Sequence, residues 1–242
     1  MAERERISTG SYDLNKWLHG GYEKGIITMI AGPPGSGKTN FVVIVSCSQA
    51  KKKNKVIFVD TEGGFSTERV KQIAGEEHES ILKNIFLLSP TKFEEQKKIF
   101  VNFLARVKKD NINLIIIDGM AMLYRLELGD AKYEEEKVRE VNREMANQMR
   151  VLAEISRKQN IPIVITNQVY SEFLPDEEWR KNSEKKVNIV GGDLLQYWSK
   201  CIIELKNENG KKRAVLLKHR NLPQKEISFE IKNQGIFKRG IF

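Results

Sequence analysis

The sequence predicts an α/β fold, with a mostly parallel central sheet flanked by helices and an antiparallel extension at its C-terminal end. Apolar runs rich in β-branched residues alternate with helical stretches up to about residue 169, which is the order of repeated βαβ units. These runs are continuously apolar, as strands covered by helices on both faces require. After residue 199 short strands follow one another across tight turns, which favours antiparallel pairing.

The expected elements follow in chain order. Strands are expected at 25–32, 55–60, 84–89, 113–120 and 161–169, and helices between them at 38–52, 66–74, 92–108 and 134–158. The dipeptide Asn209-Gly210 can supply the positive φ angles of a tight hairpin, and the short strands EISFEI and GIF follow it. We expect one domain, 1–242, although two small domains would also fit this length.

Charge and cysteine content limit the class of protein. Lys+Arg number 41 against 32 Asp+Glu, a formal net charge of +9, which indicates either a polyanionic partner or a lysine-rich solvated surface.

Cys47 and Cys201 have no CxxC neighbour, so we expect both to be reduced and buried. The N-terminus lacks the apolar core of a signal peptide and no apolar run is long enough for a bilayer, so a cytoplasmic protein is expected.

A phosphate-binding loop is the strongest motif in the chain. Residues 32–39, GPPGSGKT, match GxxxxGK[ST] between an expected strand and an expected helix. Its glycines let successive N–H groups face the β-phosphate, and the helix N-terminus adds its dipole. Lys38 would neutralise the β and γ oxygens, and Thr39 would offer its hydroxyl to Mg²⁺. The nucleotide-binding candidates are Gly32, Pro33, Pro34, Gly35, Ser36, Gly37, Lys38, Thr39 and Asn40.

Asp118 is the second metal candidate. It ends the hydrophobic run LIIID, and a carboxylate at the carboxyl end of a parallel strand can hold the water shell of Mg²⁺. Many strands end in aspartate, so this signal gains its weight from the phosphate-binding loop. Together the two predict a nucleoside triphosphatase core.

Four stretches resemble the RecA-like recombinase ATPase core shared by bacterial RecA, archaeal RadA and their eukaryotic relatives. They are STGSYDLNKWLHGGYEKGIITMIAGPPGSGKTN, VDTEGGF, LIIID and ITNQV, and the resemblance covers nearly the whole chain. It implies a RecA-like P-loop ATPase fold with ATP and Mg²⁺ as ligands. It also implies that Glu62 is catalytic and activates the attacking water, that Gln168 senses the γ-phosphate, and that Arg69 stacks on adenine. A loop carboxylate, a strand-end amide and a surface arginine are the plain alternatives.

Two basic residues near the C-terminus have more than one interpretation. Lys218 and Arg220 stand two apart on an expected strand, so both should leave the same face. They could reach the phosphates of a neighbouring subunit, as Lys-x-Arg pairs do in the related KaiC-like and helicase ATPases, or they could face DNA or solvent. His219 should point the other way, into packing or solvent.

Charge also suggests where DNA would bind. The two segments that face DNA in the resembled filaments correspond to 124–137 and 170–188, and each carries more acidic than basic residues. Tyr170, Phe173 and Trp179 are therefore expected to pack or to contact protein. Positive charge gathers on the expected hairpin instead, which predicts sequence-independent DNA binding there. The DNA-binding candidates are Lys206, Lys211, Lys212 and Arg213.

The resemblance is to a short RadA paralogue. The phosphate-binding loop begins at residue 32, and the Phe-x-x-Ala plug of the recombinase filaments occurs nowhere in the chain. We therefore expect no N-terminal helix-hairpin-helix domain, a monomer or weak oligomer, and feeble hydrolysis. The resemblance implies an accessory role without strand exchange and contact with RadA, and it leaves contact with a Holliday junction resolvase open. A KaiC-like signalling ATPase or autokinase, or a module that binds nucleotide without hydrolysing it, are the alternatives.

Overall fold

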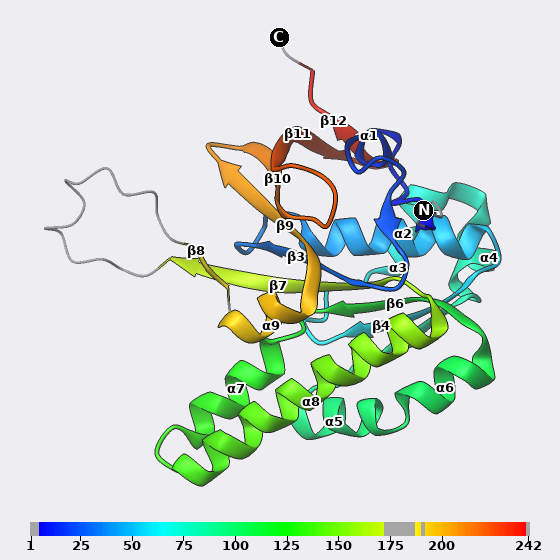
Figure 1. The fold of residues 1–242 in the computed structure, drawn as a ribbon. Helices are drawn as coiled ribbons and strands as arrows, with labels where there is room; N and C mark the ends of the chain where they lie inside the picture. The colour runs from blue at the N-terminus through cyan, green and yellow to red at the C-terminus, as the bar shows by residue number, and fades with distance from the viewer. Residues whose placement is uncertain (1–4, 172–186, 190–191, 241–242) are drawn as a thin grey trace, which may run out of the picture.

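The computed structural model describes residues 5–171, 187–189 and 192–240 (Figure 1). Its main sheet has the strand order β12-β11-β10-β9-β3-β7-β6-β4-β5, and β8 pairs with β7. The strands from β9 to β5 in this order run parallel, whereas β9 to β12 pair antiparallel. The predicted fold class, with its antiparallel C-terminal extension, is therefore confirmed.

The strands have the following bounds: β1 Arg6–Ile7, β2 Tyr22–Glu23, β3 Ile27–Gly32, β4 Lys55–Asp60, β5 Ile85–Leu88, β6 Ile112–Asp118, β7 Ile163–Ser171, β8 Val187–Ile189, β9 Ser199–Glu208, β10 Lys211–Lys218, β11 Lys225–Lys232 and β12 Gly235–Lys238. The helices are α1 Tyr12–Trp17, α2 Lys38–Lys51, α3 Thr67–Ala74, α4 His78–Leu82, α5 Phe93–Val101, α6 Phe103–Asp110, α7 Met122–Ala131, α8 Glu135–Gln159 and α9 Gly192–Trp198. A 3₁₀ turn, Gly75–Glu77, joins α3 to α4.

Helices cover both faces of the parallel strands (Figure 1). On β6, Ile116 packs with the α2 to α4 side, and its neighbours Ile115 and Ile117 pack with the α5 to α8 side. Successive side chains of a strand leave opposite faces, so a strand buried on both sides must be apolar at every position. This explains the continuous apolar runs of the sequence.

The hairpin turn was predicted correctly. Asn209 and Gly210 have φ angles of 51° and 75°, which suit a two-residue connection between antiparallel strands, and they join β9 to β10. Both cysteines are free and buried, as expected. Burial raises the pKa of each thiol to about 12, so both stay protonated and unreactive.

Some helices differ from the prediction. The helix expected at 92–108 is two helices, because the backbone leaves helical geometry at Asn102, with φ −102° and ψ 5°. Residues 122–131 form α7, which the sequence did not predict and which packs against α8 and α5. The short elements α1, α9 and the β1–β2 ribbon were also missed, because none is long enough to show a helical or strand periodicity.

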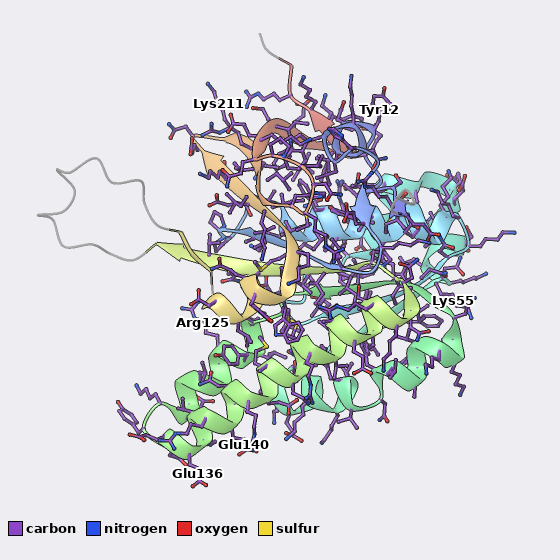
Figure 2. All side chains as sticks on the ribbon, in the orientation of Figure 1. Tyr12, Lys55, Arg125, Glu136, Glu140 and Lys211 are labelled. Carbon is purple, nitrogen blue, oxygen red and sulfur yellow. The ribbon has the colours of Figure 1, made fainter. Side chains whose placement is uncertain are left out.

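None of the helices in the described ranges combines the length and the apolar character of a bilayer span. The long helix α8 carries charges along its outer side, and Figure 2 shows Glu136 and Glu140 on its N-terminal half.

Candidate functional site

The phosphate-binding loop connects β3 to α2 at the carboxyl edge of the sheet. Gly37 has φ 107°, and a β-carbon there would lie 2.6 Å from Ile231 Cδ1, so the position accepts only glycine without rearrangement. Lys38 begins α2, and its Nζ donates to the carbonyl oxygens of Gly32, at 3.0 Å, and Pro33, at 3.1 Å. The loop is thus closed on its own lysine.

The electrostatics of Lys38 favour an anionic ligand. Burial lowers the pKa of its ammonium group, and the nearby carboxylates of Glu62 and Asp118 offset part of this effect. A buried cation held by two neutral carbonyls gains when a polyanion approaches. The triphosphate of a nucleotide would supply that charge.

Thr39 and Asp118 meet as the sequence predicts. Thr39 Oγ1 donates to Asp118 Oδ2 at 2.8 Å, and Thr166 Oγ1 donates to Asp118 Oδ1 at 2.5 Å. Burial raises the pKa of Asp118, while the two hydroxyl hydrogen bonds oppose the rise. No group of three or more His, Cys, Asp or Glu side chains gathers as a metal cage in the described residues. One carboxylate and one hydroxyl fit Mg²⁺, which usually keeps water and phosphate oxygens as its other ligands.

Glu62 and Gln168 are brought together across the sheet. Gln168 Nε2 donates to Glu62 Oε1 at 3.0 Å, although the residues lie 106 positions apart. Glu62 follows β4 and Gln168 lies on β7, and β6 separates these strands at the same edge. The two predicted side chains therefore already contact each other next to the phosphate-binding loop.

Asp60 is a positioning residue that the sequence analysis missed. It ends β4 opposite Asp118 in register. Its carboxylate accepts from the backbone N–H groups of Glu62, Gly64 and Phe65 at 3.2, 3.1 and 2.9 Å. These bonds shape the turn that presents Glu62. A second strand-ending aspartate followed by Gly-Gly was the available signal.

Gly119 gives a test of this arrangement. Its φ is +86°, and a β-carbon there would collide with Thr61 Oγ1 and lie 2.7 Å from Glu62 Cγ. Gly119→Ala should cost about 1 to 3 kcal/mol of stability and should reduce any ATP turnover by displacing Glu62. The matched control is Gly129→Ala in α7, where nothing lies within 4 Å and stability should rise by up to about 1 kcal/mol. Urea unfolding of both variants measures this difference, and equal effects would contradict the steric explanation.

Arg69 contacts the turn between β11 and β12. Its Nη1 donates to Asn233 O at 3.1 Å and to Gln72, and its Nη2 donates to Lys232 O at 2.9 Å. The same hairpin covers Gly37 through Ile231. The hydrogen bonds use the edge of the guanidinium group, which is compatible with stacking on its faces. The adenine role of Arg69 remains a prediction.

Most cations of the β9–β10 hairpin have partners. Lys206 lies 3.5 Å from Glu204, and Arg213 pairs with Glu208 at 2.5 Å and Glu226 at 3.4 Å. Lys212 Nζ donates to Gly35 O at 2.6 Å, so it supports the phosphate-binding loop. Lys211 is exposed at the start of β10 (Figure 2). DNA binding at these four residues stays a prediction, with less unpaired charge than the sequence indicated.

The expected geometry of Lys218 and Arg220 was wrong. β10 ends at Lys218, so Arg220 lies beyond the strand and the two do not share a strand face. Lys218 Nζ donates to Gln196 O at 2.8 Å, at the C-terminal end of α9. The chain leaves the strand because His219 Nδ1 accepts from the N–H groups of Asn221 and Leu222. This turn could not be read from local alternation.

His219 packs inward, which is one of its two expected environments. Its side chain is 2% exposed, and its Nε2 lies 3.7 Å from Glu23 Oε1, which also pairs with Arg6 at 3.3 Å. Burial lowers the pKa of His219, the Glu23 carboxylate opposes this, and the cations Arg6, Lys225 and Arg220 add to it. A neutral ring with Nδ1 as acceptor fits the turn.

The buried histidine predicts a pH effect on stability. The pKa of His219 is lower in the folded chain than in the unfolded chain, so the unfolded chain binds a proton more readily. The contribution of neutral His219 to the free energy of unfolding is therefore complete above the unfolded pKa of about 6.5. It is lost as the pH falls through that value. His219→Gln should therefore lose less stability than the wild type between pH 7.5 and pH 5. Urea titrations at both pH values measure this, with His78→Gln, at a partly exposed histidine, as control. Parallel losses in wild type and His219→Gln would refute the assignment.

The two segments expected to face DNA have different outcomes. Residues 124–137 are mostly helical, in α7 and the start of α8. Most of 170–188 lies outside the described residues, including Phe173 and Trp179. The backbone of Tyr170 pairs with Asn188 between β7 and β8. The expected packing role of these aromatic residues stays a prediction.

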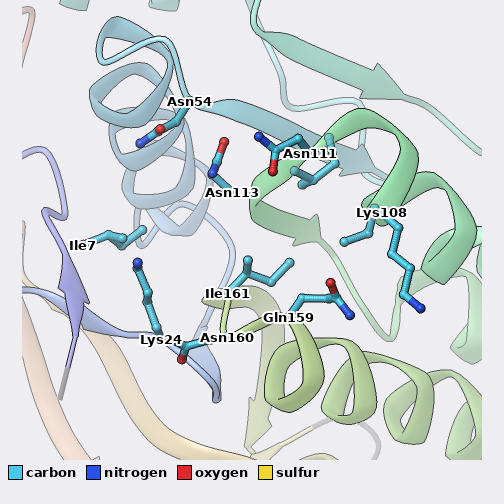
Figure 3. Close-up of a pocket in the computed structure, with 11 residues that line it drawn as sticks. Ile7, Lys24, Asn54, Lys108, Asn111, Asn113, Gln159, Asn160 and Ile161 are labelled. Atoms are coloured by element: carbon cyan, nitrogen blue, oxygen red, sulfur yellow. The ribbon is translucent and has the colours of Figure 1, made fainter. Parts of the chain in front are cut away.

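A polar hollow of about 300 Å³ lies at the opposite edge of the sheet (Figure 3). Asn111 and Asn160 border it, and each ends a helix in the left-handed conformation, which asparagine tolerates well. Lys24, also on the border, is paired with Glu5 at 2.7 Å. Helix ends account for these two asparagines.

Comparison with known proteins agrees with this geometry. A family model described as Rad51 matches residues 2–239. The DNA repair and recombination protein RadB of Methanosphaera stadtmanae is 42% identical over 240 residues, covering 98% of this chain and 97% of that protein. RadB of Methanobrevibacter smithii is 39% identical, covering 97% and 96%, and RadB of Methanocaldococcus jannaschii is 40% identical, covering 92% and 98%. These relationships confirm the RecA-like core. The chain therefore belongs to the Rad51 family and, within it, to the RadB group.

Proposed function

We propose that this chain is an ATP-binding and DNA-binding accessory protein of homologous recombination and DNA repair, which assists or regulates a RadA recombinase and performs no strand exchange itself. The meeting of Lys38, the Thr39–Asp118 pair and the Glu62–Gln168 pair at one sheet edge carries this proposal. The names of the relatives, DNA repair and recombination protein RadB, support the process. None of those names supports a KaiC-like signalling ATPase.

The nucleotide site would work by exchange of partners. Lys38 would leave the carbonyls of Gly32 and Pro33 for the β- and γ-phosphates, while loop N–H groups hold the β-phosphate. Thr39 and Asp118 would hold Mg²⁺ directly or through water. The ion, when bound, neutralises phosphate charge. Each exchange replaces a neutral or internal contact with a charge-assisted one.

Glu62 and Gln168 would convert nucleotide binding into a change of shape. The Gln168 amide now donates to Glu62, and a γ-phosphate oxygen would compete for that amide. Glu62 would then be released to orient and deprotonate water. Gln168 lies on β7, which ends at Ser171, so its movement would be transmitted to the end of that strand.

We expect hydrolysis to be slow, so the nucleotide serves mainly as a conformational gate. Related ATPases complete the site with cations from a second subunit, and the Phe-x-x-Ala plug that joins such subunits is absent from this sequence. Lys218 and Arg220 are the candidates for that cation role. The engagement of Lys218 with α9 means that it would have to be released first.

The experiment measures Mg-ATP binding by calorimetry, then ATPase rate and mass in solution, with and without single-stranded DNA. We expect binding, slow turnover and a small species. Absence of nucleotide binding would refute the proposed nucleotide site. Turnover stimulated many-fold by DNA would refute the proposal that the nucleotide serves mainly as a conformational gate. Pull-down of purified RadA and of a Holliday junction resolvase tests the proposed protein contacts.

A further inference from the structure

A groove of about 630 Å³ lies between α8 and α9. In Figure 1, α8 and α9 lie on the same side of the sheet. Its walls carry the apolar side chains Ala146, Leu194 and Trp198, together with Tyr197. Arg143 and Arg150 line it from α8, together with Glu144 and Asn147. None of these residues belongs to the nucleotide site.

The arginines form a stripe on α8. Arg143, Arg150 and Arg157 repeat every seven residues, so they share one face of the helix at intervals of about 10 Å. In the described part of the chain, none of the three lies within ion-pair distance of a carboxylate. Glu154 is on the same stripe, but it pairs with Lys158 at 2.7 Å. Arg150 Nη2 donates to Asn147 Oδ1 at 2.8 Å, and Arg150 is one of the cations that lower the pKa of Glu154. The stripe therefore presents positive charge without a carboxylate in direct contact.

Two lysines extend this positive surface beyond α9. Lys200 Nζ donates to Tyr197 O at 2.9 Å, and Lys218 Nζ donates to Gln196 O at 2.8 Å. Both acceptors are carbonyls at the end of α9, so neither bond cancels the charge, and each ammonium group keeps further donors. Arg157, Lys200 and Trp198 also border one small hollow next to the groove. The positive surface is thus continuous from α8 to β9.

Aromatic rings lie between the cations. Tyr197 is 67% exposed. Lys200 lies over its ring at 5.1 Å, and Trp198 meets it edge to face at 5.4 Å. These contacts hold the ring in place. A fixed, exposed ring beside cations is what stacking on a nucleobase requires.

We infer that this α8–α9 groove binds single-stranded nucleic acid, with Arg143 and Arg150 on phosphates and Tyr197 against a base. The inference rests on the DNA binding proposed above and gives it a location. The cations of the groove differ from those of the β9–β10 hairpin, where Lys206 and Arg213 pair with glutamates. A cation without a carboxylate partner can neutralise a phosphate and release a counterion, which favours binding. A paired cation must first leave its glutamate.

An acidic peptide is the competing occupant. It would satisfy the two arginines and the apolar wall, since arginine, tyrosine and tryptophan also dominate protein interfaces. The positive surface, however, continues past the groove through Arg157, Lys200 and Lys218. A chain with one negative charge at every repeat uses the whole length of that surface.

The test is fluorescence anisotropy of a labelled oligothymidylate, titrated with the full chain at several salt concentrations. Arg143→Gln/Arg150→Gln should weaken binding at least about tenfold and reduce the magnitude of the salt slope by about 1.4. The control Lys51→Gln/Lys71→Gln removes the same charge from exposed lysines of α2 and α3, on the other face of the sheet, and should stay within about twofold of wild type. Tyr197→Leu should lose about tenfold, and Tyr12→Leu, also at a highly exposed tyrosine, should lose nothing.

Each outcome has one meaning. If the wild type and the arginine variant bind the oligothymidylate equally well, nucleic-acid binding at the groove is refuted. An acidic protein partner is then the favoured occupant of the groove. An equal loss in the Lys51→Gln/Lys71→Gln control also overturns nucleic-acid binding at the groove. Failure of the wild type to bind any oligothymidylate overturns the proposed DNA binding itself. If the arginine variant does not fold by circular dichroism, Tyr197→Leu decides the result against its Tyr12 control.

Discussion

Replacing Lys38 with alanine should weaken Mg-ATP binding on the order of a hundredfold. The lost ammonium group would make charge-assisted contacts to the β and γ oxygens, worth about 3 kcal/mol together. The variant should nevertheless keep its thermal midpoint, because the present partners of Lys38 are two neutral carbonyls and burial lowers its pKa. Calorimetry and thermal denaturation measure the two effects separately.

The matched control for Lys38→Ala is Lys51→Ala. Lys51 ends the same helix, α2, and pairs on the surface with Glu77 at 3.0 Å. Its removal should leave nucleotide affinity unchanged, because surface ion pairs contribute about 0 to 1 kcal/mol to stability and nothing to this site. Unchanged affinity in Lys38→Ala would contradict the phosphate-binding assignment.

Replacing Glu62 with glutamine should lower ATP turnover about a hundredfold or more while leaving affinity within about twofold. A positioned general base contributes about 10² to 10⁴ in rate, and glutamine cannot accept the proton from water. Glutamine keeps the shape of Glu62 and an oxygen acceptor for Gln168 Nε2, now at 3.0 Å. Single-turnover assays, with protein in excess over nucleotide and above its Kd, suit the slow wild-type rate.

Glu68→Gln is the control for Glu62→Gln. Glu68 is an exposed carboxylate in the first turn of α3 that accepts hydrogen bonds from Ser66 and Thr67, so it carries no expected catalytic role. Equal turnover in Glu62→Gln and wild type would show that the residual hydrolysis needs no base at this position. The chain would then be a nucleotide-binding module in which Glu62 serves only Gln168.

Local patterns predicted the sheet and the centre of the site. The run from Leu114 to Ile117 had to be a strand buried on both faces, and Asn209-Gly210 had to turn a hairpin. The phosphate-binding loop required the positive φ angles that Gly35 and Gly37 have, 71° and 107°. In each case neighbours in the chain determine the geometry, because backbone freedom and apolar periodicity are local properties.

Contacts between distant segments were not predictable in the same way. Arg213 looked like an available cation in the sequence, yet it pairs with Glu226 across β10 and β11. Lys212 contacts Gly35, 177 positions away. Strand register decides which charges meet, and a single-residue shift would place these side chains on the other face.

The sequence by itself determined the class of fold and the chemistry of the phosphate-binding loop, since these follow from apolar patterning and from the few residues that a triphosphate cradle permits. The tertiary structure decided which cations are neutralised and which remain available. It also formed the α8–α9 groove from residues about fifty positions apart, Arg143 and Trp198 among them. Charge becomes a binding surface only after folding sets the distances, because electrostatic attraction depends on separation and not on order in the chain.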